Sequence, residues 1–453
     1  MAKQLRVALV SCGNRARMFG EFCRRHADLA KIVAVAEPRD EWREEERQRN
    51  NLPPVRAYRS YEQMLAPGGP EAELAIVASD DRTHYGAARM AVERGMNVLL
   101  EKPVAHDPVL TVHLALLARK HKVRVAVQHE LRYSPFFQQV LEIVRSSRLG
   151  QVYSYTHTEH VEFWHMTHSF VRGNWSNSDE QNPMILAKCC HDLDLMPWIL
   201  GDEVTRVASF GRLDHFTPAN RPPGAPARCT DGCPVRATCI HDAEAFYMGP
   251  RTDWPVAMMG PGFYRNATPE ERRRRLVASR YSRCVYDGRN NVVDHQSVMM
   301  ETRRGTICTL TMQGFSAGEE CGRKIRLDGT LGTLRGDMGR GEIAVWRHWH
   351  GPFGTKVAPE IIDLKKAGLG GHGGGDERLF EHVLRVFAGA EEPGEEPLTT
   401  IDNSVESHLL AWAAEESRLK GRVVDMDAYR KRIAARAKKL MSRKRSARTK
   451  RLR

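Results

Sequence analysis

The chain has 453 residues, of which 41% are hydrophobic and 28% charged, and its formal net charge is +13. This length predicts two domains, each large enough to bury its own core. Residues 430–453 contain 13 Lys and Arg side chains and no acid, so the rest of the chain is close to neutral and the composition excludes a basic, nucleic-acid-binding body.

No apolar stretch of the sequence approaches the roughly 18 residues that a membrane-spanning helix needs. No basic-then-apolar leader precedes Leu5, and 10 cysteines in a chain without a leader favour free thiols over disulfides. We therefore expect a cytoplasmic protein with no membrane partner.

Apolar runs alternate with helical patterns over the first 128 residues. Strands are predicted at 5–10, 32–36, 74–78, 99–100 and 123–127, with helices ending near 25 and at about 40–49, 61–65, 83–94 and 108–121. Such alternation is typical of a doubly wound parallel sheet. Residues 1–128 are thus expected to form a dinucleotide-binding Rossmann domain.

The loop after the first strand is a degenerate dinucleotide fingerprint. Ser11 takes the place of the first glycine of G-x-G-x-x-G/A, Gly13 allows the backbone to approach the pyrophosphate, and Ala16 permits helix–strand packing. Asn14 and Arg15 lie in the same loop and are expected at the cofactor.

Glu37 ends the second predicted strand, about 20 residues after the loop, as a ribose-binding acid should. A carboxylate there accepts hydrogen bonds from the ribose hydroxyls and repels a 2′-phosphate, which favours NAD. Arg39 is close to Glu37 in sequence, so NADP remains an alternative cofactor. Ser79 and His84 follow a later strand end and are also expected at the cofactor, although a helix-opening His is as often structural.

The run Asn97–Pro103 is expected to contain a buried strand that is followed at its end by Glu101 and Lys102. Open α/β sheets bind ligands outside the carboxyl ends of their strands, so both side chains are placed at the cofactor edge. A lysine at the end of a buried strand can have a lowered pKa and exchange protons with a substrate hydroxyl. The alternative is an ordinary solvated lysine.

A second domain is expected at 129–427. Ser134-Pro135 begins a helix, and β-rich runs at 151–161, 291–301, 306–315, 324–328 and 342–346 predict an antiparallel sheet, with later helices at 377–387 and 404–419. The aromatic stretch 162–175 places His168 and Arg172 at the substrate or, equally, at a subunit contact. His372 and Asp376, in a glycine-rich loop, are candidates for the rim of the site; a plain hinge is the alternative.

An insertion at about 216–280 carries Cys229, Cys233 and Cys239, with Cys284 or His241 as a fourth candidate ligand. Three thiols close together in a polar loop suggest a structural zinc ion, and reduced thiols packed on one another are the alternative. The basic tail 428–453 is expected to be disordered or a frayed helix, and it is the part that could attract nucleic acid.

The motifs together resemble the Gfo/Idh/MocA oxidoreductases over roughly residues 5–427. They are Ser11 to Ala16, Thr83-His84, Glu101-Lys102-Pro103, Leu131 to Pro135, and His191-Asp192-Leu193-Asp194 ahead of Trp198. The resemblance implies a Rossmann domain plus an α/β domain with a large, mainly antiparallel open sheet, and bound NAD(H) or NADP(H). It implies Lys102 and His191 as catalytic residues, and it makes the free face of the sheet a subunit interface. We place Arg132 and Asp194 at the substrate.

Family dehydrogenases usually carry an Asp four residues before the catalytic His, where this chain has Ala187 followed by Lys188. Lys188 and His191 are three residues apart and are expected on one helix face, so Lys188 is a third catalytic candidate.

The leading hypothesis is oxidation or reduction of a hydroxyl or keto group of a sugar, cyclitol or sugar derivative. The alternatives are an NAD-dependent glycosidase or lyase that oxidises transiently, and a non-catalytic NAD-binding regulator. The expected partners are a carbohydrate-like substrate and further copies of the chain in a homodimer or homotetramer.

Overall fold

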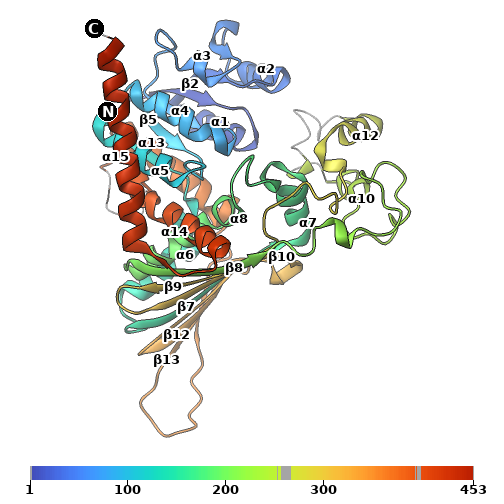
Figure 1. The fold of residues 1–453 in the computed structure, drawn as a ribbon. Coiled ribbons are helices and arrows are strands. Elements are labelled where there is room, and N and C mark those ends of the chain that lie inside the picture. The colour runs from blue at the N-terminus through green and yellow to red at the C-terminus, as the bar shows by residue number, and fades with distance from the viewer. Residues whose placement is uncertain (1–2, 252–253, 257–266, 393, 395–398, 452–453) are drawn as a thin grey trace.

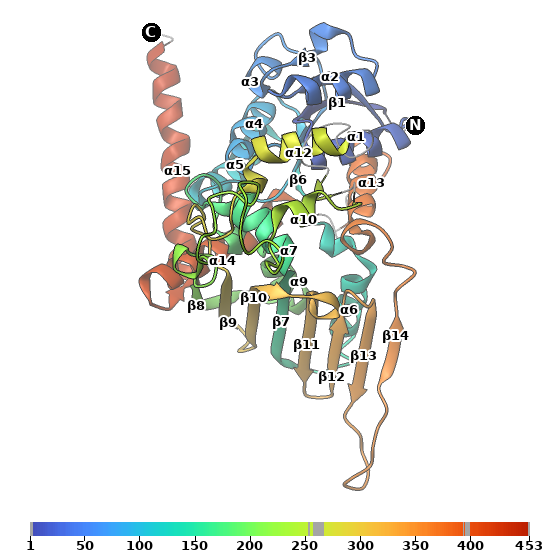
Figure 2. The same cartoon turned by 90° about the vertical axis from the view of Figure 1, so that its right-hand side faces the viewer.

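The computed structural model describes residues 3–251, 254–256, 267–392, 394 and 399–451. Two sheets of six and nine strands dominate it, and helices lie between the sheets and around the smaller one (Figures 1 and 2). In this described part, no helix is long and apolar enough to cross a membrane. Residues 252–253 and 257–266 of the predicted insertion, and 452–453 of the predicted tail, lie outside the described ranges.

The six-stranded sheet is parallel throughout and has the order β3-β2-β1-β4-β5-β6. Its strands are β1 (Leu5–Val10), β2 (Ala30–Ala36), β3 (Ala57–Tyr58), β4 (Leu74–Val77), β5 (Asn97–Leu100) and β6 (Val125–Val127). The order reverses between β1 and β4, the point at which doubly wound sheets bind ligands. The predicted Rossmann architecture is confirmed. The edge strand β3 was not predicted, because two residues are too few to carry a pattern.

Helices cover both faces of this sheet. One face packs α1 (Asn14–Arg25), α2 (Asp40–Arg49) and α13 (Gly375–Phe387), and the other packs α3 (Tyr61–Met64), α4 (Asp81–Glu93) and α5 (Pro108–His121). Phe380 of α13 stacks on Phe19 of α1 with ring centroids 5.7 Å apart. A helix from late in the chain therefore completes the first domain, and a domain boundary near residue 129 stays a prediction.

The nine-stranded sheet has the order β14-β13-β12-β11-β7-β10-β9-β8-β15. Its strands are β7 (Val152–Glu162), β8 (Val204–Arg212), β9 (His295–Thr302), β10 (Ile307–Ser316), β11 (Gly322–Gly329), β12 (Gly332–Asp337), β13 (Glu342–Arg347), β14 (Glu360–Asp363) and β15 (Val424–Asp425). Only the β7–β10 pair among these described strands is parallel, which confirms the mainly antiparallel sheet.

One face of the larger sheet packs against helices and the other is open. Helices α6 (Pro135–Arg145), α9 (Cys190–Leu200) and α14 (Ile401–Lys420) form the main core with its inner face. Along these strands, buried side chains on the inner face alternate with more exposed side chains on the open face. The open face includes large apolar groups, such as Phe210 at 77% and Met299 at 56% exposure.

Short elements surround the edge between the two sheets. They are η2 (Glu130–Tyr133), α7 (Phe163–Met166), the π-helical turn η3 (Thr167–Arg172), η4 (Asn174–Ser176), α8 (Met184–Ala187) and η9 (Gly371–Gly374). Between β8 and β9 the insertion contributes α10 (Ala243–Tyr247), α12 (Pro269–Ala278) and η7 (Arg280–Ser282), and stands out beside the body in Figure 1. Its own apolar cluster is small, so it has little core to hold it together.

The basic tail is part of the long helix α15 (Met426–Arg451). Tyr429, Ile433 and Ala437 are buried, and α15 runs alongside α5 at the side of the molecule (Figures 1 and 2). The expectation of a disordered or frayed tail is therefore wrong for the first half of this segment. Charge density alone suggested disorder, but an apolar residue every three to four positions gives this helix a face to bury.

Candidate active site

Lys102 lies two residues after the end of β5 and points at the junction between α8 and α9. Its Nζ donates a hydrogen bond to the backbone carbonyl of Ala187, at 3.0 Å. Ala187 is the position at which the family pattern usually has an Asp, so a backbone oxygen holds the ammonium where a carboxylate would be expected.

The charge on Lys102 is stabilised by its surroundings. Burial alone would lower its pKa, but neighbouring acidic groups outweigh burial and raise it; they are Cys190, Glu101, Glu130 and Asp81. The expectation of a lowered pKa is therefore corrected. At neutral pH Lys102 is an ammonium donor, and another group must accept the substrate proton.

His191 lies in the first turn of α9 and is only 3% exposed. Burial, and then the positive charge of Lys102, hold its pKa well below the ordinary value for histidine. Its imidazole is consequently neutral at pH 7 and can accept a proton. Lys102 contacts the carbonyl of Ala187, at the end of α8, and His191 lies in the following helix.

Lys188 is not on the same helix as His191. Lys188 ends α8 and Cys189 begins α9, so the chain turns between the two predicted catalytic residues and the expected shared helix face is absent. Lys188 Nζ lies 3.3 Å from Glu159 Oε1 of β7, and Glu159 also pairs with Arg323 at 2.8 Å.

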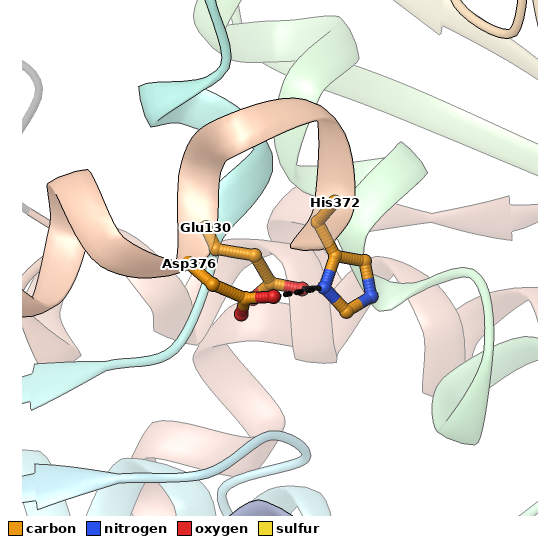
Figure 3. A group of neighbouring side chains, drawn as sticks. All are labelled: Glu130, His372 and Asp376. Atoms are coloured by element: carbon orange, nitrogen blue, oxygen red, sulfur yellow. Dashed lines mark hydrogen bonds and ion pairs between the residues drawn. The ribbon is translucent and has the colours of Figure 1, made fainter. Parts of the chain in front are cut away.

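Glu130 is a site residue that the sequence analysis missed. Its side chain converges with those of His372 and Asp376, as Figure 3 shows. His372 Nδ1 lies 3.2 Å from Glu130 Oε1 and 2.9 Å from Asp376 Oδ2, and His191 Nε2 lies 3.4 Å from the same Glu130 oxygen. Glu130 is 1% exposed, and neither of its oxygens accepts a hydrogen bond from the residues described. Burial raises its pKa.

The ligand atoms of Glu130, His372 and Asp376 lie within 4.8 Å of one another, a spacing that a metal ion could use. Arg15 already supplies positive charge there, because its Nη2 is 2.8 Å from Asp376 Oδ1 and its Nε pairs with Glu101. Burial opposes ionisation of Asp376, but the contacts with His372 and Arg15 lower its pKa. We therefore interpret the group as an ion-pair network that joins α1, β5 and α13.

The fingerprint loop has the features that a dinucleotide needs. Ser11 has φ 81°, the left-handed conformation for which glycine is usual, and Gly13 precedes the first turn of α1. No side chain among the described residues caps this helix start, and its first turn, which begins at Asn14 and includes Ala16, contains no acid. Free backbone N–H groups and a positive helix end suit a pyrophosphate.

Glu37 and Arg39 lie beside this loop. The Glu37 carboxylate accepts from the backbone N–H of Cys12 at 2.9 Å and from Arg39 Nε and Nη2 at 2.7 and 2.9 Å. Burial opposes ionisation of Glu37, but Arg39 and Cys12 lower its pKa. Acid and guanidinium thus stand together where the adenosine ribose would lie.

His84 connects the loop that follows β4 with the loop that follows β5. Its Nε2 is 2.9 Å from the carbonyl of Ser79 and its Nδ1 is 2.8 Å from that of Pro103. Both ring nitrogens contact these carbonyls and the side chain is 1% exposed, so His84 positions the loop that carries Lys102, and its expected contact with the cofactor stays a prediction.

Arg132 and Asp194 form an ion pair with each other. Arg132 Nε and Nη2 donate to the two Asp194 oxygens at 2.6 and 2.7 Å, and both side chains are buried. The expected contacts of these two residues with substrate stay a prediction. The pair fastens η2 to α9, and so sets Glu130 opposite His191.

His168 and Arg172 anchor the insertion. His168 Nδ1 is 2.7 Å from the Tyr247 hydroxyl, and Arg172 donates to the carbonyls of His241 at 2.6 Å and Arg283 at 2.7 Å. Both side chains are buried, and their expected contact with substrate or with a second subunit stays a prediction. Aromatic and guanidinium composition is common to ligand pockets and to buried polar anchors, and the sequence alone could not separate them.

Two family models match the chain. The model described as the oxidoreductase family with NAD-binding Rossmann fold matches residues 5–129, and the model of its C-terminal alpha/beta domain matches residues 142–426. Both belong to the Gfo/Idh/MocA oxidoreductases.

Similar proteins share this organisation. YteT of Bacillus subtilis is 23% identical over 352 residues, covering 73% of this chain and 78% of its own. Inositol 2-dehydrogenase of Corynebacterium glutamicum strain R is 24% identical over 208 residues, covering 46% and 57%. The WlbA dehydrogenase of Chromobacterium violaceum, solved with NADH and UDP-GlcNAcA, has a TM-score of 0.64 at 18% identity, covering 93% and 96%. An inositol dehydrogenase homologue of Azotobacter vinelandii, solved with NAD+, has a TM-score of 0.66 at 15% identity, covering 94% and 98%. Likeness at this identity shows the shared fold.

Proposed function

Because the chain belongs to the Gfo/Idh/MocA oxidoreductase family, we propose that it oxidises a hydroxyl, or reduces the corresponding keto group, of a sugar, cyclitol or sugar derivative. The observation that supports this proposal is that Lys102 reaches the backbone carbonyl of Ala187, four residues before His191, while the neighbouring Glu101 pairs with Arg15 of the fingerprint loop. The relatives named for inositol and the solved structure with a nucleotide sugar favour a polyhydroxylated substrate.

The residues at the loop fit a nicotinamide dinucleotide. The start of α1, at Gly13 and Asn14, would hold the pyrophosphate, and Glu37 would accept from the ribose. Ser79, at the end of β4, would line the same edge. When bound, the cofactor supplies or accepts the hydride. NAD is favoured by the buried Glu37 carboxylate, and Arg39 keeps NADP as an alternative.

The protein's own part is handling of the proton. The Lys102 ammonium would donate a hydrogen bond to the substrate oxygen and stabilise negative charge there, while the neutral His191 imidazole takes the hydroxyl proton. Glu130, 3.4 Å from His191, would stabilise the imidazolium that results. Lys188 and the half-exposed His372 would orient the remaining hydroxyls.

Lys102→Ala tests this proposal. Turnover should fall by about 10²–10⁴-fold, the usual effect of a positioned acid–base group, while dinucleotide binding measured by calorimetry stays near the unmodified value. Lys120→Ala, at the exposed end of α5, is the matched control and should leave both unchanged. Unaltered turnover in Lys102→Ala would show that the site is wrongly assigned.

The same assay, run with NAD+ and a panel of sugars and cyclitols, separates a dehydrogenase from a redox-assisted lyase or glycosidase. A dehydrogenase accumulates reduced cofactor in proportion to product. Product without net reduction would favour the lyase or glycosidase, and inactivity with all substrates despite tight binding of cofactor would favour the regulator.

We also propose that the protein is cytoplasmic and forms a homodimer or homotetramer through the open face of the larger sheet. The exposed apolar groups of β8, β9 and β10 support such an interface, because isolated large apolar patches favour association.

A further inference from the structure

We propose that the insertion between β8 and β9 holds a structural zinc ion, bound by the thiolates of Cys229, Cys233, Cys239 and Cys284. The four residues come from two segments separated in sequence by α10 and α12. They nevertheless line one small pocket. The proposal is independent of the dehydrogenase activity, because this cavity is built by the insertion and not by the fingerprint loop.

The cavity has the size of one ion. Its volume is about 10 Å³, close to the least that holds a single water. Among the residues described, Glu130, His372 and Asp376 are the one set of three ligand atoms lying within 4.8 Å of one another, so the sulfurs surround the cavity at a wider spacing. Zinc–sulfur bonds of roughly 2.3 Å would draw them inward by side-chain rotation, which a small cavity permits.

The groups around the cavity suit thiolates. Arg172 is 2% exposed and its Nη2 lies 3.5 Å from Cys229 Sγ. The backbone N–H of His241 donates a hydrogen bond to the Cys239 sulfur, and that of Tyr286 donates one to the Cys284 sulfur. Zinc with four thiolates carries net negative charge, and a buried guanidinium with two N–H donors offsets it.

The position of the cluster explains what an ion would do for the fold. The backbone N–H of Cys284 donates to Ala227 O at 2.9 Å, and that of Cys229 donates to Ser282 O at 2.8 Å, so the two ends of the insertion run side by side. An ion at the four sulfurs would fasten both ends and the turn that carries Cys233. Cross-linking a long loop with a small core of its own restricts the unfolded chain most.

His241 is the competing ligand. It lines the same cavity, is 6% exposed, and its Nδ1 has no hydrogen-bond partner in the described structure. The four-cysteine assignment predicts that its imidazole packs beside the ion without binding it, so His241→Gln should keep the metal.

Elemental analysis of the full-length protein, purified without chelator and without added metal, tests the site. We expect about one zinc per chain, its loss in Cys233→Ser and in Cys284→Ser, and its retention in His241→Gln. Cys321→Ser is the matched control, because that thiol is equally part-buried but does not line the cavity. Exchange for Co²⁺ should give the absorption of a tetrahedral thiolate site, and dinucleotide binding should persist in the zinc-free variants.

Three results would each overturn the proposal. One is a metal-free preparation that takes up no zinc after dialysis and whose four thiols titrate freely. Another is a disulfide among the four cysteines in the purified protein. The third is zinc lost in His241→Gln but kept in Cys233→Ser. Loss of turnover in Lys102→Ala with zinc retained would leave the metal proposal standing, so the two assignments fail separately.

Discussion

At the end of β2 the Glu37 carboxylate is shared between the fingerprint loop, through the N–H of Cys12, and the guanidinium of Arg39. The acid is 2% exposed, whereas the Arg39 side chain is 49% exposed and can turn outward. An anionic 2′-phosphate would have to displace the acid from Arg39, while a ribose hydroxyl would only add a donor to it. The pair therefore favours NAD without closing the site to NADP.

Glu37→Ala should weaken NAD and strengthen NADP relative to it, because the ribose acceptor and the repulsion of phosphate are lost together. Hydrogen bonds to charged groups contribute about 1.5–3 kcal/mol, so the Kd ratio of the two dinucleotides should shift by at least tenfold in titration calorimetry. Arg39→Ala is the complementary variant and should weaken NADP more than NAD. A preference for NADP in the unmodified protein would show that Arg39, and not Glu37, sets the choice.

From the residue types in the sequence, the chemistry of the site could be predicted better than the contacts that its side chains make. Lys102, His191 and the loop at Gly13 could be named because each stands in a motif tied to a strand or helix end. Arg132 and Asp194 stand in motifs of the same kind, but their charges cancel each other in the core. No sequence motif around Glu130 marks it as a site residue, because the residues that it meets, His372 and Asp376, come much later in the chain.

At the scale of elements, periodicity identified the strands of the Rossmann sheet and the long central strands of the second sheet. It missed β8, β12, β14 and β15, because glycines interrupt β8 and β12 and the other two strands have only 4 and 2 residues. It also treated α8 and α9 as one helix. The turn at Lys188 and Cys189 separates the two helices, and Lys102 donates to the backbone carbonyl of Ala187 directly before that turn.

Helix α15 provides the prediction at this scale. Ile433 is 2% exposed in the core that α15 shares with the second domain, so Ile433→Ala should lower the free energy of unfolding by about 2–4 kcal/mol. Lys431→Ala, two residues earlier on the exposed side, is the control and should change it by less than about 0.5 kcal/mol. Chemical denaturation followed by circular dichroism gives both values, and equal stability of the two variants would mean that α15 is not docked in solution.

At the scale of the whole molecule, the open face of the nine-stranded sheet has no covering layer in the described structure. Phe210 of β8 and Met299 of β9 are exposed on it, beside Ile307 at 42% and Phe315 at 47% on β10. A sheet with one apolar face free in solution would favour burial against a second copy.

Phe210→Asp should therefore convert the assembly to a smaller species in size-exclusion chromatography with light scattering, since an interfacial carboxylate would be buried without a partner. Val55→Asp is the control, because Val55 is 74% exposed but lies far away on η1 (Pro54–Arg56). A monomeric unmodified protein, or an assembly that tolerates Phe210→Asp, would remove this face as the interface.

The packing of α13 on α1 imposes an order on biosynthesis. The surface that Phe19 and Phe22 present to Phe380 is made early in translation, but its cover emerges from the ribosome only after most of the second domain has been made. Until then the nascent Rossmann sheet exposes an apolar stripe that a chaperone could bind. A gene fragment encoding residues 1–128 alone would lack this cover permanently.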